Sequence, residues 1–280
     1  MEGRRITDDH IGSFVRYLEE NERSRVTISK YLHDVRVFVA FSEGAATDKS
    51  LVMRYKELLG REYTVSGANS MIAALNSFLR FLGWEDCCVK QFKVQRRAYC
   101  SEAEELTRTE YVRLISAAER RGNDRLSLVI QTICGTGIRV SELEYVTVEA
   151  ARRGEAEVSC KGKLRTVFIV PALRKKLMDY AGRQGLKSGP IFVTKRGKPI
   201  CRSNVWREMK SLCDLSGVRP EKVFPHNLRH LFARTFYGIE RDIVKLADVL
   251  GHSSIDTTRI YVVTTGAEHK RRMENMHLII

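Results

Sequence analysis

The sequence predicts a mainly α-helical protein with one small antiparallel β-sheet, organised as an N-terminal four-helix domain and a larger helical domain. Apolar residues recur at helical spacing through most of the chain, whereas residues 156–170 alternate as strands do around a tight turn. A polar stretch with neither period separates the first ninety residues from the rest. The 280 residues are 43% apolar and 29% charged, which is typical of a folded globular protein.

The first domain is expected over residues 1–84 as four short amphipathic helices. Each has apolar residues three and four positions apart, and glycines 44, 60 and 83 are expected to end the last three. Four such helices joined by short connections predict a small bundle. The four helices are expected over Asp8–Glu20, Ile28–Val39, about Thr47–Leu59 and about Thr64–Leu82.

Residues 85–105 are expected to be an interdomain linker, because they are polar and lose the helical period. Helical order resumes at Thr107 and Glu110, which are spaced as a capping box. Leu106 and Tyr111 occupy the two positions of a hydrophobic staple around the same helix start. A new domain is therefore expected to begin at residue 106.

The second domain is expected over residues 106–280 and is again mostly helical. Its one hairpin is predicted by β-branched, alternating residues on both sides of the turn at 161–163. Pro171 is suited to the first turn of the helix that follows. The expected elements are helices from Thr107 through Ile133, strands Ala156–Cys160 and Leu164–Val170, a helix from Pro171 to about Arg183, a short strand Ile191–Val193, and helices from Ser203 onward.

The net charge of +14 is concentrated in the second part of the chain. Residues 1–90 hold 13 basic and 13 acidic side chains, whereas residues 91–280 hold 35 and 21. Such an excess attracts polyanions, and nucleic acid is the usual partner. A generally basic, solvated surface is the alternative explanation.

Several classes are excluded by what the sequence lacks. No apolar run reaches the ~18 residues that a membrane helix needs, and the first residues lack the apolar stretch of a secretory signal. The seven cysteines show neither a CxxC pair nor a His/Cys metal spacing. We therefore expect a cytoplasmic protein with reduced thiols, without a membrane span or a structural zinc site.

Four short segments carry residues suited to chemistry. Each has an ordinary explanation when taken singly: an arginine after a glycine turn is often a helix cap, a lysine at a hairpin tip is usually solvated, and a tyrosine in a late helix is normally core. The segments are Thr136-Gly-Ile-Arg-Val-Ser-Glu-Leu143, Cys160-Lys-Gly-Lys163, His226-Asn-Leu-Arg-His230, and Leu250-Gly-His252 followed by Thr257-Thr-Arg-Ile-Tyr261.

Together these residue types can transfer a phosphoryl group without a metal ion. Two guanidiniums can grip one phosphate, imidazoles can donate to the same oxygens or move a proton, and a lysine can protonate a leaving oxygen. A tyrosine hydroxyl can be a covalent nucleophile. Ionising a free tyrosine at pH 7 costs about 4 kcal/mol, which a dense cationic cluster would offset.

The four segments resemble those of the tyrosine recombinases, also called the phage integrase family. The resemblance extends from about Thr107 to about Val263 and implies a SAM-like, core-binding helical domain before it. It also implies the role of each candidate residue. Arg139 and Arg229 are the catalytic arginines, Glu142 orients Arg139, Lys161 is the hairpin lysine, His226 and His252 assist, and Tyr261 is the nucleophile.

The sequence departs from the family pattern in small ways. Cys160 stands before Lys161 where many relatives have glycine, so Lys163 is the alternative general acid. Leu231 stands where threonine is frequent. We expect no arm-binding module before the first bundle, and in this the chain resembles compact Xer-like and transposon-type recombinases.

The resemblance implies a site-specific recombinase that serves DNA integration, excision or inversion. Such enzymes cut and rejoin duplex DNA through a 3′-phosphotyrosine and a Holliday junction, as a homo-tetramer on two double-stranded DNA sites. They use no cofactor or metal ion, although accessory DNA-bending or directionality proteins can take part. The two domains are expected to form a C-shaped clamp around the duplex.

Three other functions are the alternatives. A type IB topoisomerase-like strand transferase would relax DNA without recombining two sites, and an accessory DNA-binding protein would lack part of the residue set. A zinc or magnesium nuclease would need a cluster of acidic ligands, which the sequence does not contain.

The apolar end Leu278-Ile-Ile280 is expected either to fold onto its own domain or to pack on a neighbouring subunit.

Overall fold

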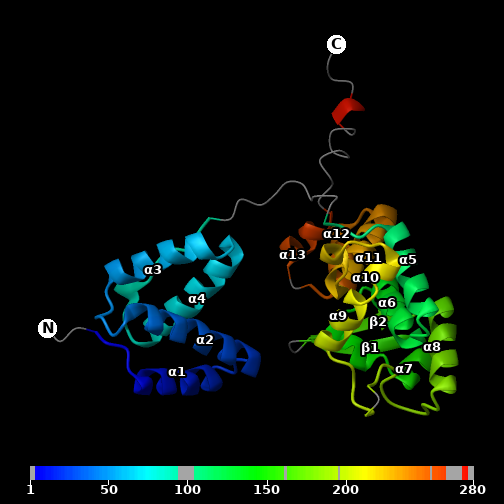
Figure 1. Cartoon of the computed structure of the whole chain (residues 1–280), viewed down its shortest axis with the longest axis horizontal. Coiled ribbons are helices and arrows are strands. Elements are labelled where there is room, and N and C mark those ends of the chain that lie inside the picture. Colours follow the sequence, from blue (N-terminus) through cyan, green and yellow to red (C-terminus); the bar gives the residue numbers. More distant parts are fainter. Residues whose placement is uncertain are drawn as a thin grey trace. The chain divides into compact units, whose positions relative to one another are not determined.

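The computed structural model describes residues 4–93, 104–160, 163–194, 196–252, 254–262 and 273–276. The chain divides into two compact units, Met1–Arg96 and Arg97–Ile280, and each is described by itself (Figure 1). Both units are mainly helical, and the sheet found in the described residues is a two-stranded antiparallel one. The predicted fold class is therefore confirmed.

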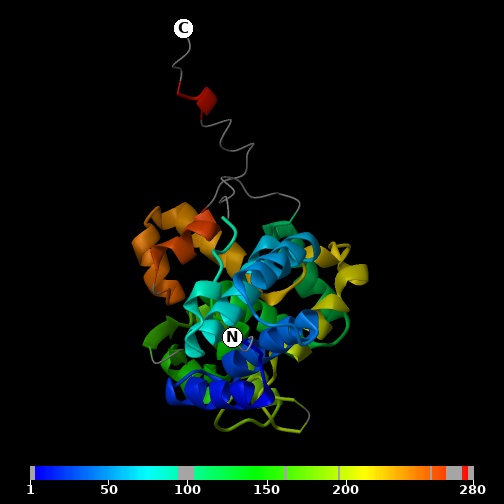
Figure 2. The ribbon, with the colours of Figure 1, turned by 90° about the vertical axis from the view of Figure 1, so that its left-hand side faces the viewer.

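The first unit consists of four helices around apolar clusters, shown from one side in Figure 2. A side-chain oxygen caps the start of each helix, from Thr7, Ser24, Asp48 and Thr64 in turn. The fully buried side chains include Phe14, Tyr55 and Phe78. The helices are α1 (Asp8–Glu20), α2 (Arg25–Ser42), α3 (Lys49–Glu62) and α4 (Val65–Phe81), with a 3-10 turn η1 (Glu85–Cys87) after them.

Helix α3 continues past Gly60, so the expectation that this glycine ends the helix was wrong. A Cβ atom at Gly60 would lie 2.9 Å from Cζ of Phe92. The glycine therefore serves close packing, because the absence of a side chain lets the Phe92 ring approach the helix backbone.

The segment after η1 is held on α4 by two asparagines, Asn69 and Asn76. The buried Asn76 amide donates to Val89 O at 2.8 Å and accepts from Val89 N at 3.0 Å. Asn69 makes the same pair of bonds with Phe92, at 2.9 and 2.8 Å. Residues 85–93, which the sequence places in the linker, thus pack on the first unit. The linker residues 94–103 lie outside the described residues.

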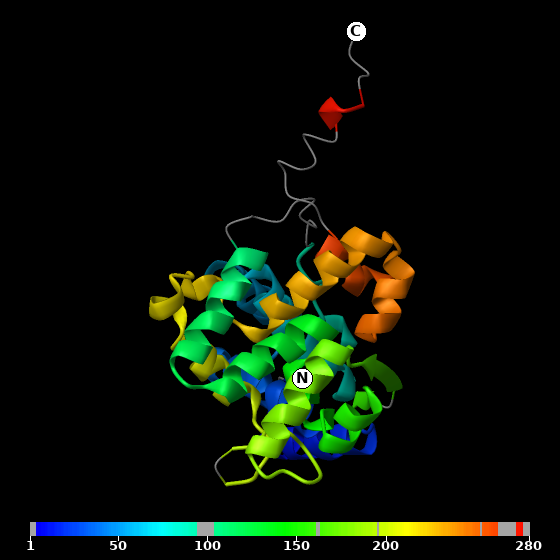
Figure 3. The same cartoon turned by 90° about the vertical axis from the view of Figure 1, so that its right-hand side faces the viewer.

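The second unit packs α5, α6 and α8 side by side (Figure 3). Apolar side chains of these helices share a core with the hairpin and α11. Its elements are α5 (Arg108–Arg120), α6 (Asp124–Thr136), η2 (Val140–Tyr145), α7 (Val148–Arg153), β1 (Glu155–Cys160), β2 (Lys163–Phe168), α8 (Pro171–Arg183), α9 (Arg202–Lys210), α10 (Cys213–Ser216), η3 (Pro220–Lys222), α11 (Pro225–Glu240), α12 (Ile243–Leu250) and α13 (Ile255–Val262).

The hairpin of β1 and β2 is where the sequence predicts it. Its register pairs Cys160 with Lys163 at the turn and Ala156 with Val167 further along. Ala156, Val158 and Val167 are buried, so one face of the hairpin joins the core. The predicted site residue Lys161 lies outside the described residues.

The short strand expected at Ile191–Val193 was wrong. In its place the chain makes single bridges, Thr147 with Pro190 and Val193 with Pro199. The two bridges pair this segment with different parts of the chain, residue 147 on one side and residue 199 on the other, so no continuous ladder forms along 191–193. The elements between residues 140 and 153 were not anticipated, because their apolar residues are too closely spaced for a clear period.

Gly137 ends α6 and is a position where an alanine should be costly. Its φ is +65°, and a Cβ atom there would lie 2.5 Å from Cδ1 of Phe232. We expect Gly137→Ala to lower the free energy of unfolding by about 2–4 kcal/mol, from overpacking and backbone strain. Gly122→Ala is the matched control, since Gly122 has the same φ of +65° and open space around it. Equal losses for the two variants in urea unfolding would contradict the packing argument.

Candidate active site

The predicted site residues are delivered by short turns at the ends of helices. Gly137, in the left-handed conformation, turns the chain out of α6 so that Arg139 stands directly before η2. His226 and Arg229 lie in the first turns of α11, which Pro225 begins. His252 follows α12 through another left-handed glycine, and Tyr261 lies on α13.

Arg229 is at the centre of the site and its side chain is almost fully buried, at 2% exposed. It donates to Gly137 O, to Leu250 O at 2.7 Å and to Nε2 of His252 at 2.9 Å. Burial and the charge of Arg139 lower the pKa of Arg229 to about 10, so the guanidinium stays charged at neutral pH. Its bonds to helix-end carbonyls fix that charge in place.

Arg139 and Glu142 form a closed pair. The Glu142 carboxylate accepts from the Arg139 backbone N–H at 2.8 Å and from Nη1 of the same residue at 2.7 Å. Burial raises the pKa of Glu142, but these hydrogen bonds and the charge of Arg165 outweigh burial, and the net pKa lies below its usual value. Glu142 therefore stays ionised and orients the guanidinium, whose Nη2 reaches Gly251 O at 3.3 Å.

The His252 ring is fixed from both sides. Its Nε2 faces the Arg229 guanidinium, which can only donate, so Nε2 accepts and Nδ1 carries the proton. That proton points to the buried Thr258 hydroxyl, 2.9 Å away. Burial and the charges of Arg229 and Arg139 lower the pKa of His252 to about 4, so the ring is neutral at pH 7.

Tyr261 packs among three histidine rings and is 2% exposed. Its ring centroid lies 4.4 Å from that of His230, 5.5 Å from that of His252 and 5.8 Å from that of His226. The Tyr261 hydroxyl lies near the Arg229 guanidinium, and its influence raises the pKa of the arginine. The phenol is thus held beside a fixed positive charge.

A cavity of about 620 Å³ opens beside these residues. One part of its wall is cationic, with Arg139, Arg202 and Arg229 next to His226. The other part is apolar and includes Trp206 and the residues at the start of α11. Such a site suits a phosphodiester, with the phosphate on the guanidiniums and the sugar on the apolar wall.

The structure thus brings together Arg139, Glu142, His226, Arg229, His252 and Tyr261. It also adds residues that sequence reasoning missed: Arg165, Thr258, His230 and Arg202. His230 stands inside a segment singled out from the sequence, and Thr258 lies three residues before the tyrosine, where helical spacing puts both on one face. Arg165 and Arg202 had no such signal.

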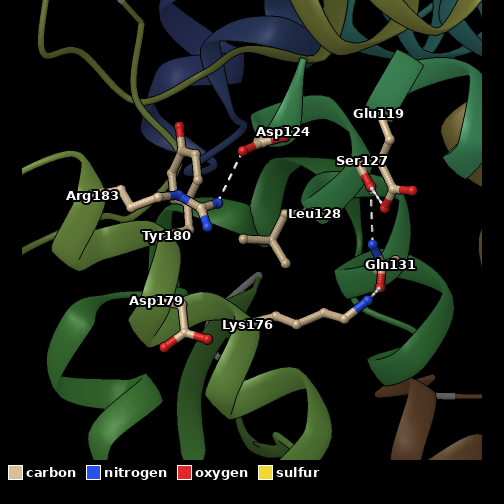
Figure 4. A pocket seen from close by; sticks show the side chains of 9 residues that line it. All are labelled: Glu119, Asp124, Ser127, Leu128, Gln131, Lys176, Asp179, Tyr180 and Arg183. Carbon is tan, nitrogen blue, oxygen red and sulfur yellow. Dashed lines mark hydrogen bonds and ion pairs between the residues drawn. The ribbon is translucent and has the colours of Figure 1, made fainter. Parts of the chain in front are cut away.

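A second cavity, of about 270 Å³, lies between α5, α6 and α8 (Figure 4). Its polar side chains mostly satisfy one another, with Lys176 donating to Gln131 at 2.7 Å and Arg183 to Asp124 at 2.9 Å. None of the predicted site residues lines it. The chemistry therefore belongs to the first cavity.

The described part of the chain shows no group of three or more His, Cys, Asp or Glu side chains placed to hold a metal ion. Within the same ranges no helix has both the length and the apolar character needed to cross a bilayer.

The lowered histidine pKa values predict how stability depends on pH. His230 and His252 each have a pKa of about 4, with desolvation as the largest cause, against about 6.5 in an unfolded chain. The unfolded state binds more protons between these values, so the free energy of unfolding should fall as the pH falls from about 6.5 to about 4. His230→Gln should flatten this slope. Urea unfolding followed by tryptophan fluorescence measures the slope. It is done on a Trp84→Phe background, in which Trp206 is the remaining tryptophan.

His33→Gln is the control. His33 is exposed on α2 of the first unit, and the sequence separates it widely from His230 and His252. A slope that His230→Gln leaves unchanged would contradict the assignment.

Comparison with known proteins gives consistent matches. The model of the phage integrase family matches residues 104–267, and the model of the phage integrase N-terminal SAM-like domain matches residues 11–86. The chain is 30% identical to tyrosine recombinase XerA of Thermococcus kodakarensis, with 96% of this chain and 95% of that protein covered. It is 28% identical to XerA of Pyrococcus furiosus, with 100% and 98% covered. The lambda integrase tetramer bound to a Holliday junction has a similar fold, with a TM-score of 0.72, 19% identity, and 93% and 78% covered.

Proposed function

This chain belongs to the phage integrase family and is a site-specific tyrosine recombinase, and from that premise we propose that Tyr261 is its nucleophile toward a scissile phosphate in duplex DNA. The observation that carries the proposal is the position of the Tyr261 phenol against Arg229 and His252, beside a cavity with cationic and apolar walls. A tyrosine in such a cluster can form an ester with phosphate while neighbouring cations neutralise the charge.

In the proposed reaction the Tyr261 oxygen attacks the phosphorus and the bond to the 5′-oxygen breaks. The product is a 3′-phosphotyrosine and a free 5′-hydroxyl. Arg139 and Arg229 stabilise the non-bridging oxygens as their charge grows. His226 donates to the same oxygens, and His252 assists by holding the Arg229 guanidinium through its Nε2. The 5′-hydroxyl of the exchanged strand then attacks the phosphotyrosine and releases Tyr261. The energy of the cleaved phosphodiester bond is kept in the phosphotyrosine bond, so the cycle needs no ATP.

His226 fits a role that needs a neutral imidazole. Partial desolvation and the charges of Arg229, Arg202 and Arg139 lower its pKa, so at pH 7 the ring can donate or accept one proton. The ring is exposed on the first turn of α11 and faces the cavity. A substrate phosphate would raise this pKa by adding negative charge.

The assembly belongs to the same proposal. Two-site strand exchange through a Holliday junction would use a homo-tetramer, as in the lambda integrase complex. The domains predicted over 1–84 and 106–280 would hold the duplex between them, and the compact units 1–96 and 97–280 support such a division. The apolar end at 278–280, which is expected to fold onto its own domain or to pack on a neighbouring subunit, lies outside the described residues. Accessory proteins and a cytoplasmic location complete the proposal.

Covalent trapping tests the proposal directly. A duplex carrying a candidate site and a nick beside the scissile phosphate loses a short fragment after cleavage, so the protein stays attached to DNA. We expect an adduct that survives denaturation and disappears on protease treatment. Relaxation of plasmids without recombination between two sites would favour a topoisomerase, and binding without any adduct would favour an accessory protein.

Lys161 is proposed as the general acid for the 5′-oxygen. Lys161→Ala should slow cleavage of ordinary DNA and be rescued on a 5′-bridging phosphorothiolate, because the sulfur leaves without a proton. Cleavage rates on the two substrates, measured in single-turnover reactions, give the comparison. Lys163→Ala is the control from the same turn. Equal defects on both substrates for Lys161→Ala would transfer the role to Lys163.

A further inference from the structure

The C-terminal end of α12 binds three guanidiniums from three other parts of the chain. The last carbonyls of a helix have no partner within it and carry the negative end of its dipole. They can therefore hold cations that repel one another. The three bonds run from Nη1 of Arg165 to Val249 O at 2.7 Å, from Nη2 of Arg229 to Leu250 O at 2.7 Å, and from Nη2 of Arg139 to Gly251 O at 3.3 Å.

Arg165 differs from the other two arginines because it does not line the cavity. It comes from β2, and its side chain is 11% exposed. Its Nη2 donates at 2.6 Å to the Glu142 oxygen that also accepts the Arg139 backbone N–H. Arg165 thus ties one carboxylate, and through it Arg139, to the end of α12.

The stem of Arg165 also fills the space over Gly251. A Cβ atom at Gly251 would lie 2.4 Å from Cδ and 2.7 Å from Nε of Arg165. Gly251 directly precedes His252, so the arginine packs against the turn that presents this histidine. The absence of a side chain at Gly251 is what allows the contact.

We propose that Arg165 is a positioning residue for strand cleavage: it fixes Glu142 and the Gly251 turn as one rigid unit, so that Arg139 and the Arg229 guanidinium held by His252 act on the same phosphate. The inference rests on the proposed function.

Stability alone does not explain this arrangement. Replacing buried ion pairs by apolar side chains is often neutral or favourable for stability. In addition, the Nε–H of Arg165 is buried without a hydrogen-bond partner in the described ranges. A side chain that served only the core would not need this unsatisfied donor, whereas a planar fork is needed to span a carboxylate and a carbonyl.

Arg165 also contributes charge beside His252. Burial and the charges of Arg229, Arg139 and Arg165 lower the His252 pKa. Removing one of these charges should therefore raise it. The groups that face His252 are Arg229 and His226 from α11, Arg139 before η2, Arg165 from β2, and Thr258 and Tyr261 from α13.

Two substitutions separate geometry from charge. Arg165→Val removes both, so we expect cleavage about 100-fold slower, with single-site DNA affinity nearly unchanged and the His252 pKa raised. Arg165→Lys keeps the charge but cannot span both acceptors, so cleavage should fall while the His252 pKa stays near its original value. Single-turnover cleavage, binding anisotropy and NMR titration of labelled histidines give the three readouts. Unchanged cleavage in both variants would overturn the proposal.

Gly251→Ala displaces the arginine without changing it. Gly122→Ala is the matched control, because the φ angles are +64° and +65° and nothing lies near a Cβ atom at Gly122. We expect Gly251→Ala to cleave at least tenfold more slowly than Gly122→Ala. On the Arg165→Val background the same change should add little, since the contact is already gone. An equal loss on both backgrounds would overturn the proposal.

Wild-type adduct formation on the same nicked duplex is measured first. Adducts formed at equal rates by the wild type and both Arg165 variants overturn the positioning role alone. The absence of any adduct from the wild type overturns the proposed function and this inference together.

Discussion

Replacing Tyr261 by phenylalanine is expected to abolish covalent protein–DNA adducts while duplex binding survives. The change removes one oxygen atom and leaves the ring, which packs at 4.4 Å against His230 and stacks on His252. Because the arginines of the cavity are untouched, affinity for the site should change little. Denaturing gels of a labelled suicide duplex measure the adduct, and fluorescence anisotropy measures binding.

Tyr237→Phe is the natural control. Tyr237 belongs to the same apolar cluster as Tyr261 and lies on α11, so its variant tests whether any hydroxyl nearby suffices. We expect full adduct formation from this variant. If Tyr261→Phe still becomes attached to DNA, then Tyr261 is not the nucleophile, and Tyr237 and Tyr180 are the next candidates.

Much of the site could be predicted because its residues stand in short local segments. A left-handed turn, a helix start after proline and a Leu-Gly-His helix end can each be recognised in the sequence. The residue types in these segments suit one reaction. The helices of the first unit were equally visible, since their apolar residues keep one period. The predictions that failed depended on distant neighbours: Gly60 is explained by Phe92, and the segment around 191–193 makes single bridges to two different parts of the chain, at residues 147 and 199, instead of one strand ladder.

Arg165 shows why the rest could not be predicted. On a strand, its position indicates only that it lies on the same face as the buried Val167, and says nothing of its polar partners. Its two acceptors, Glu142 and Val249, lie 23 and 84 residues away. No local period or motif connects such positions, and only the folded chain brings them together.

The clustering of cations in this site has a physical cost that the fold offsets locally. Burial lowers the pKa of Arg229, and repulsion from Arg139 lowers it further. Against this, Glu142 binds two of the arginines and the end of α12 accepts from three. The positive charge is therefore assembled before substrate arrives, and little reorganisation is needed when charge develops on the phosphate.

This preorganisation makes Arg139→Ala the second large effect. Its side chain is 32% exposed, and Glu142 keeps its ion pair with Arg165, so the variant should fold. Cleavage is expected to slow by about 10³-fold or more, or about 4 kcal/mol of transition-state stabilisation, because an arginine on a transferring phosphoryl group acts mostly in the transition state. DNA affinity should fall by less than about tenfold.

Arg202→Ala is the matched control, because Arg202 lines the same cavity but lies on α9 and is exposed. Its loss should weaken binding more than it slows cleavage, as expected for a cation that contacts DNA equally in ground and transition states. Arg229→Ala is less informative, since it would leave the carbonyls of Gly137 and Leu250 buried without donors. Single-turnover rates at saturating protein, together with titrated affinities, separate the two effects. If Arg139→Ala loses affinity and rate in equal proportion, then Arg139 binds DNA uniformly and has no special role in the transition state.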